Sequence, residues 1–141
     1  MIASAWRADR GACFGYIQQT LDHILLGDRI WLGRFTDEEI KPAGLDEQQY
    51  VEFEDLRAAR EALDREIIRW VGSLDDETLQ DDVSYHGIAN PEQRHCPLWF
   101  ALSHFFNHQT HHRGQVTTLL SQLGVDYGTT DLIAQPGYVS R

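Results

Sequence analysis

Seven histidines occur in this chain of 141 residues, and four of them lie in the segment HFFNHQTHHRGQ: His104, His108, His111 and His112. Histidines four positions apart project from one face of a helix, close enough for two imidazoles to share an ion. The pairs His104/His108 and His108/His112 have this spacing. Imidazole is a ligand for zinc, nickel, iron and manganese, so the segment predicts a divalent transition-metal site.

Helical geometry favours the second pair. With His104 at zero and about 100° per residue, His108 falls near 40°, His112 near 80° and His111 near 340°. The apolar stripe of the same helix spans roughly 60° to 120°. It comprises Leu98, Ala101, Phe105, Val116, Leu119 and Leu123. We therefore expect His108 and His112 to point inward, with His104 and His111 at the edge of the stripe.

A third ligand is expected from another element, because two imidazoles rarely complete a metal site. His23 is the candidate, since it lies midway along the most apolar helical pattern of the chain. Thr20 and Gly27, one turn away, leave space around its ring. A single histidine on an apolar helix is more often a core residue than a ligand. Three histidine ligands would leave coordination positions open for water or substrate.

Three long helical patterns would position these residues, over 14–35, 47–71 and 97–123. Pro42 and Gly44 break the chain between the first two, and Asp46 is a plausible N-cap for the second. Residues 83–88 and 93–96 could form a short hairpin. His86 and His95 in that segment are interpreted as surface residues. The tail over 125–141 is expected to be irregular and to drape over the bundle.

Composition limits the classes of function. Twelve basic residues stand against 22 acidic ones, a formal net charge of −10, which disfavours binding to nucleic acid or to an anionic membrane. No stretch approaches the roughly 18 apolar residues of a membrane span. Two widely separated cysteines, Cys13 and Cys96, predict neither a disulfide framework nor a cysteine zinc cluster. We expect a single domain over 1–141 in a cytoplasmic protein.

Three segments together resemble the DinB family, also called DinB/YfiT-like. They are TLDHILLGDRIWLGRF (20–35), LRAAREALD (56–64) and HFFNHQTHHRGQVTTLLSQLGVDYGTTDLI (104–133). The resemblance implies an all-α, up-down four-helix bundle. It also implies a metal bound by one histidine of the LDHILL helix and two of the NHxxHH motif, here His23, His108 and His112.

One departure concerns the start of the chain. Family members usually carry a full helix before the one with the first histidine, whereas here only about a dozen residues precede Phe14. The usual N-terminal helix is therefore expected to be shortened or missing. Its absence would expose one flank of an apolar helix, at about 25 cal/mol per Å². We predict a homodimer whose partner subunit covers this flank.

The resemblance also suggests a reaction. Some relatives look like transferases in which zinc activates a small-molecule thiol, such as bacillithiol or mycothiol, for attack on an electrophile. We expect a zinc- or nickel-dependent thiol S-transferase or a related detoxification or stress enzyme, with His104 and His111 as auxiliary residues. Two alternatives stay open: a metal-assisted hydrolase, although no carboxylate separates His108 from His112, and a non-catalytic metal-stabilised binding protein. Asp28 and Arg113 are expected to form a structural ion pair, and Trp31 to belong to the core.

Overall fold

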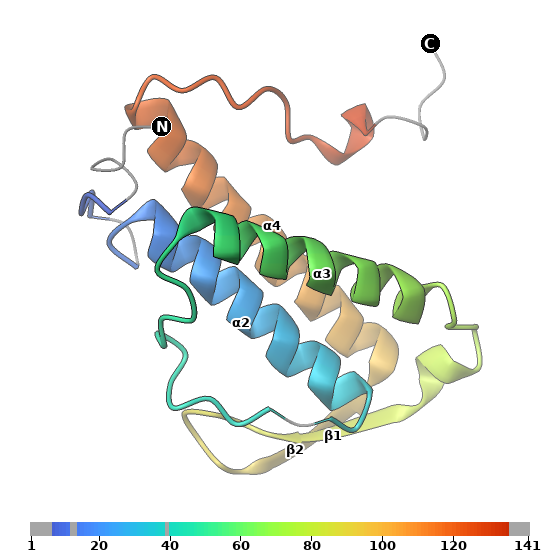
Figure 1. Ribbon diagram of the computed structural model, residues 1–141. Coiled ribbons are helices and arrows are strands. Elements are labelled where there is room, and N and C mark those ends of the chain that lie inside the picture. Colours follow the sequence, from blue (N-terminus) through green and yellow to red (C-terminus); the bar gives the residue numbers. More distant parts are fainter. Residues whose placement is uncertain (1–6, 12–13, 39, 136–141) are drawn as a thin grey trace.

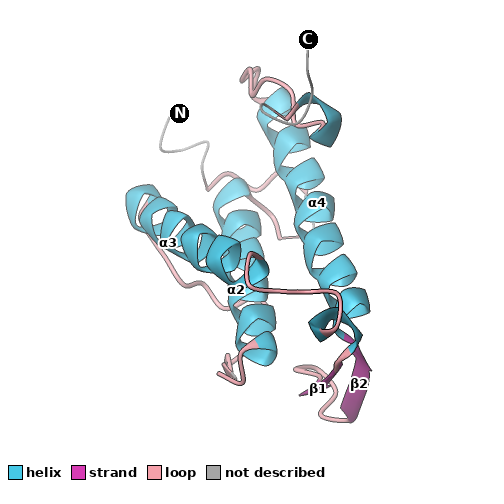
Figure 2. Cartoon of the chain, turned by 90° about the vertical axis from the view of Figure 1, so that its right-hand side faces the viewer, coloured by secondary structure: helices cyan, strands magenta, loops and turns pink. Residues whose placement is uncertain are grey.

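The computed structural model describes residues 7–11, 14–38 and 40–135. Within them the elements are α2 (Ile17–Phe35), α3 (Phe53–Val71), η1 (Thr78–Gln80), β1 (Asp82–His86), β2 (Gln93–Pro97), α4 (Leu98–Gln122) and η2 (Leu132–Ala134). Helix α2 lies between α3 and α4, and the two strands lie at the ends of α2 and α4 (Figures 1 and 2). None of these helices combines the length and the hydropathy that crossing a membrane requires.

The expected all-α, four-helix bundle is wrong. The described residues form three α-helices and a two-stranded antiparallel sheet. The strands pair from Asp82 with Pro97 to His86 with Gln93. Val83 turns inward to pack on Leu98, Leu102 and their neighbours, which favours a hairpin here over another helix. The expected hairpin is thus confirmed. The expectation of a shortened N-terminal helix falls largely on residues outside the description, and 7–11 and 14–16 are not helical.

Helix α2 is buried almost all round, as its apolar sequence predicts. Its apolar residues meet those of α3 and α4 in one core cluster. The buried members are Ile17, Leu25, Leu32, Leu56, Leu63, Ile67, Phe105, Val116 and Leu119. This cluster fixes α2 against α4, and these are the two helices that carry the candidate metal ligands.

Helix α3 begins at Phe53, six residues later than its sequence pattern predicts. The backbone before it is held by buried polar groups of α2 instead of by helical hydrogen bonds. Asp22 Oδ2 accepts hydrogen bonds from the backbone N–H groups of Gln49 (3.2 Å) and Tyr50 (3.3 Å). Gln18 Nε2 donates to the Tyr50 carbonyl at 2.5 Å. The α2–α3 loop therefore stays extended along α2 (Figure 1).

Residues 125–135 are irregular apart from η2, as expected, but they do not drape over the bundle. Leu132 and Ile133 are 87% and 78% exposed. Figure 1 shows the segment leaving the end of α4 and running past the helices. None of residues 125–135 belongs to either described core cluster.

Candidate metal centre

His23 is buried near the middle of α2, with 8% of its surface exposed. Its Nδ1 lies 2.9 Å from the backbone carbonyl of Leu45 in the α2–α3 loop. Because a carbonyl can only accept, Nδ1 carries the proton and Nε2 keeps its lone pair. A hydrogen bond of this kind fixes the tautomer and orientation of a metal-ligating histidine. The loop that Asp22 anchors thus also orients His23.

His112 is held by a similar contact on α4. Its Nδ1 lies 2.8 Å from the side-chain oxygen of Gln115, one turn along the helix, and the residue is 7% exposed. The amide oxygen accepts the Nδ1 proton, so Nε2 of His112 also keeps its lone pair. His108 lies one turn before His112 and is half-buried.

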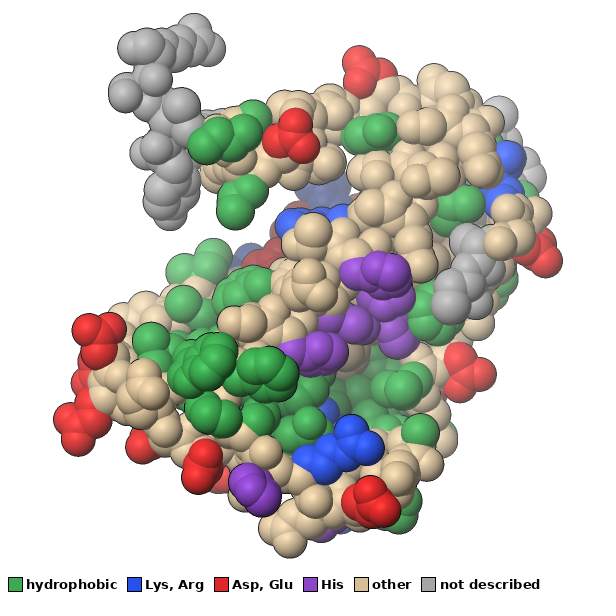
Figure 3. Space-filling model, turned by 180° about the vertical axis from the view of Figure 1, so that it is seen from behind, with side chains coloured by type: hydrophobic (Ala, Val, Ile, Leu, Met, Phe, Trp, Pro, Cys, Tyr) green, Lys and Arg blue, Asp and Glu red, His purple; other side chains and the backbone are tan. Residues whose placement is uncertain are grey.

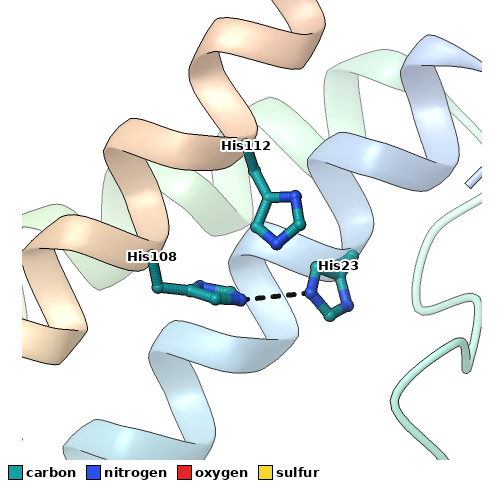
Figure 4. A group of neighbouring side chains, drawn as sticks. All are labelled: His23, His108 and His112. Atoms are coloured by element: carbon teal, nitrogen blue, oxygen red, sulfur yellow. Dashed lines mark hydrogen bonds between the residues drawn. The ribbon is translucent and has the colours of Figure 1, made fainter. Parts of the chain in front are cut away.

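The three imidazoles converge between the two helices (Figure 4). Nε2 of His23 and Nε2 of His108 are 3.2 Å apart, and one ligand nitrogen from each of the three residues lies within 4.8 Å of the others. Bonds of about 2.05 Å in a tetrahedral site would place two nitrogens about 3.3 Å apart. The His23–His108 pair already has this separation. The arrangement is within metal-binding distance.

An aromatic ring closes one side of the cluster. Phe14 stacks on His23, with ring centroids 4.1 Å apart and planes at 26°, and it lies 5.6 Å from the His112 ring. An apolar cover of this kind limits the access of water and lowers the local dielectric. Phe14 therefore shields the His23 and His112 rings from solvent on one side of the cluster.

The surroundings favour uncharged imidazoles. Burial, and then the neighbouring rings of His112 and His23, lower the pKa of His108 from 6.5 to about 4. The pKa of His112 is also lowered, again chiefly by burial. Neutral imidazole is the form that binds metal. His108 and His112 are thus uncharged at neutral pH. Because His23 Nε2 can only accept, the single ring proton of His108 lies on Nε2 in the hydrogen bond to His23.

This protonation state predicts a weak pH dependence of metal binding. Because the His108 ring is already neutral at pH 6, zinc binding moves its one proton to the other ring nitrogen and releases no proton to solvent. Three histidines with ordinary pKa values of about 6.5 would instead lose affinity steadily below neutrality. We expect calorimetric titrations in buffers of different ionisation enthalpy to show less than one proton released per zinc at about pH 6. Release of two or more protons would contradict the lowered pKa values.

Gly27 leaves room for the His108 ring. A Cβ at this position would lie 2.9 Å from Cε1 of His108, so an alanine would push the ring aside. Gly27→Ala should therefore weaken zinc binding strongly. The fold should persist, because alanine is favoured over glycine in a helix by about 1 kcal/mol. Calorimetry and thermal unfolding would check both expectations, and unchanged zinc affinity would contradict the placement of His108.

The other histidines lie outside the cluster. His104 and His111 are exposed on α4, and His86 and His95 are exposed on the hairpin, as expected. His104 lies against Trp31, with ring centroids 5.1 Å apart, and burial followed by the charge of Arg34 lowers its pKa. The side-chain amide of Gln115 reaches His111 at 3.4 Å. Of the two expected auxiliary residues, only His104 lines the cavity described next.

A cavity of about 470 Å³ adjoins the cluster. His23, Gly27 and His108 form one side, and its other walls include Trp31, Arg34, Tyr85, His104 and Arg94. Trp31 packs against the core cluster, as expected, and it also lines this cavity. The sequence does contain a signal for this wall of the cavity. Gly27, Trp31 and Arg34 follow His23 at intervals of four, four and three, which places them on one face of α2. Tyr85 and Arg94 come from the hairpin, and local spacing could not connect them to His23.

Asp28 pairs with a different residue from the one expected. Its Oδ2 lies 2.5 Å from a guanidinium nitrogen of Arg60 on α3 and accepts a hydrogen bond from Gln109 Nε2 at 2.9 Å. Arg113 instead donates to the hydroxyl of Thr110. Asp28 is thus the point where α2 is tied to both other helices, and the expected Asp28–Arg113 ion pair is wrong.

Comparison with known proteins identifies the family of this chain. The sequence profile of the DinB family matches residues 3–137. Searches of curated proteins and of solved structures give no match. The matched range contains all three histidines of the cluster and almost the whole chain. The chain therefore belongs to the DinB family.

Proposed function

We propose that His23, His108 and His112 hold one divalent transition-metal ion, zinc or nickel, and that the protein is a metal-dependent thiol S-transferase. The observation that supports this proposal is the convergence of three imidazoles beside a cavity. A site with three protein ligands keeps a position for substrate, as catalytic zinc sites do. Uncharged nitrogen donors without a carboxylate suit zinc and nickel better than magnesium or calcium.

When bound, the metal would supply Lewis acidity that favours the deprotonated form of a thiol. The chain's own residues would do the rest. A ring nitrogen of His104, uncharged at neutral pH because its pKa is lowered, would accept the proton of the thiol. The sulfur lone pair would then form a bond to the carbon of the electrophile, and the leaving group would depart with its bonding electrons. Trp31 and Tyr85 would hold the organic part of the substrate.

Metal-assisted hydrolysis is the weaker alternative, because it usually needs a carboxylate general base beside the metal. No Asp or Glu is among the described residues that line the cavity. Asp28, on the same helix as His23, is 1% exposed and is occupied by Arg60 and Gln109. It is therefore not placed to activate a water molecule.

The reaction can be tested with zinc- or nickel-loaded protein, a panel of small-molecule thiols and an electrophile such as 1-chloro-2,4-dinitrobenzene. Product formation should follow metal content. It should fall to background in His108→Ala and drop in His104→Ala, whose metal content should not change. A rate equal to that of metal in buffer would overturn the transferase. If the metal then still raised thermal stability, the non-catalytic binding protein would be the better description.

A homodimer stays a prediction, but the exposed flank of α2 that prompted it is not found, because every residue of α2 is buried or half-buried. Trp99 and Phe106 lie seven residues apart on α4 and are 47% and 44% exposed, which makes this surface of α4 a candidate for contact with a second copy. Sedimentation velocity of the intact chain would show a dimer that Phe106→Glu dissociates. A monomer across the accessible concentration range would contradict the prediction.

A further inference from the structure

The cavity beside the histidine cluster has a charge opposite to that of the whole protein. The chain carries 22 acidic and 12 basic residues, yet the described residues that line this cavity include Arg34 and Arg94 and no Asp or Glu. In Figure 3 histidine and basic side chains lie on the same face, with hydrophobic side chains between them. We propose that this cavity binds a small organic carboxylate, with its charged group at Arg94 and its body toward His108.

Arg34 is held in one orientation. Its guanidinium lies 4.5 Å from the centroid of the Trp31 ring and 4.6 Å from that of Tyr85. One of its terminal nitrogens also donates to the backbone carbonyl of His86 at 2.8 Å. Stacking and a hydrogen bond together fix the planar group before a ligand arrives, so little side-chain entropy remains to be lost on binding. Arg34 therefore forms a fixed wall of the cavity beside Trp31 and Tyr85.

Arg94 supplies a more adaptable charge. It pairs with Tyr85 across the hairpin, and residues directly opposite each other on paired strands present their side chains to the same face. Both side chains line the cavity. Arg94 is exposed, and no acidic residue in the described part of the chain forms an ion pair with it. A guanidinium with this freedom can form a bidentate contact with a carboxylate.

The size and the donors of the cavity narrow the class of ligand. A volume of about 470 Å³ is in the range of sites for small organic molecules. Trp31 and Tyr85 offer aromatic surface between the charged end and the histidines. No lysine lines the cavity, and one guanidinium already donates to a backbone carbonyl. This donor set suits a single carboxylate better than a doubly charged phosphate.

The proposed function is needed only for one further step, in which the bound carboxylate is part of a substrate, either the thiol or the electrophile. Binding of the carboxylate to the cavity does not depend on the proposed function, so it can be tested on metal-free protein. The probes are 3-phenylpropionate, its neutral amide 3-phenylpropionamide, and phenyl phosphate, with affinities measured by NMR titration. The matched variants are Arg94→Gln and Arg113→Gln. Both lose one positive charge, but Arg113 does not line the cavity.

We expect the intact protein to bind the acid about tenfold or more tightly than the amide, as a charge-assisted hydrogen bond predicts. Arg94→Gln should abolish this preference and Arg113→Gln should keep it. Equal binding of acid and amide, or a preference that survives Arg94→Gln, would overturn the proposal. Tighter binding of phenyl phosphate would overturn the carboxylate class. Failure of the metal site would instead appear as absent zinc uptake, with these affinities unchanged.

Discussion

Asp28→Ala is expected to lower the free energy of unfolding by about 3 kcal/mol, near the lower end of the range for breaking one partner of a buried ion pair. The carboxylate is 1% exposed and contacts Arg60 of α3 and Gln109 of α4. Its loss would leave the Arg60 guanidinium, whose side chain is only 26% exposed, with Asp64 as its remaining partner at 2.7 Å. Because Arg60 keeps this contact with Asp64, we expect a loss of stability near the lower end of the range.

The double variant Asp28→Leu/Arg60→Met is the control for this prediction. An apolar pair of similar volume often replaces a buried ion pair without net loss, so the double variant should recover most of the stability lost in Asp28→Ala. Urea unfolding of the metal-free proteins would measure both. A loss below about 1 kcal/mol in Asp28→Ala, the usual size for exposed pairs, would contradict the role of Asp28 as the tie between three helices.

The same residue predicts a pH dependence with a defined sign. Burial raises the pKa of Asp28 from 3.8 to about 6, against the lowering effect of the Arg60 charge. A raised pKa in the folded state means that the stabilisation linked to protonation of Asp28 is full below about pH 4 and is lost as pH rises through 6, while the contacts with Arg60 and Gln109 remain. Asp28→Asn cannot titrate. Wild type should therefore lose stability relative to Asp28→Asn between about pH 4 and pH 7, and a difference independent of pH would contradict the raised pKa.

His108→Ala is expected to abolish the stabilisation that zinc gives to the fold. A ligand present at 100 times its dissociation constant stabilises the folded state by about 2.7 kcal/mol, and wild type should show this gain in thermal or urea unfolding. His108 lies 3.2 Å from the His23 nitrogen and is central to the cluster, so its loss leaves two ligands from different helices. Zinc should then leave the unfolding transition unchanged.

His104→Ala is the matched control. His104 lies one turn before His108 on the same helix, but it is exposed and does not belong to the cluster. This variant should keep the full zinc-dependent gain in stability. Loss of the gain in both variants would show that the metal binds along the outer histidines of α4 and not between α2 and α4.

The histidine cluster could be predicted from sequence because its determinants are mostly local. The spacing of His108 and His112 on a helix and the apolar stripe beside them decide which ring faces inward. His23 could be added because α2 is apolar on nearly all sides, so a polar ring within it must face a buried neighbour. The structure brings these three residues together as predicted.

The remaining features depend on contacts between distant segments. The start of α3 is delayed by hydrogen bonds that Asp22 accepts from the backbone N–H groups of Gln49 and Tyr50, and no local pattern shows them. Arg60 lies 32 positions from Asp28, so the choice between Arg60 and Arg113 required the packing of α3. Arg94 reaches the cavity only through the hairpin. The hairpin itself was predicted from its local pattern, but the four-helix expectation drawn from the resemblance did not include it.

The central claim is that three histidines hold one metal ion, and elemental analysis of tag-free protein after zinc loading and desalting tests it most directly. Wild type, His23→Ala, His108→Ala and His104→Ala would be compared at matched concentration, with circular dichroism to confirm that each is folded. We predict about one equivalent of zinc per chain, bound with tetrahedral geometry, in wild type and in His104→Ala, and none in the other two. Wild-type protein that takes up neither zinc nor nickel would contradict the claim.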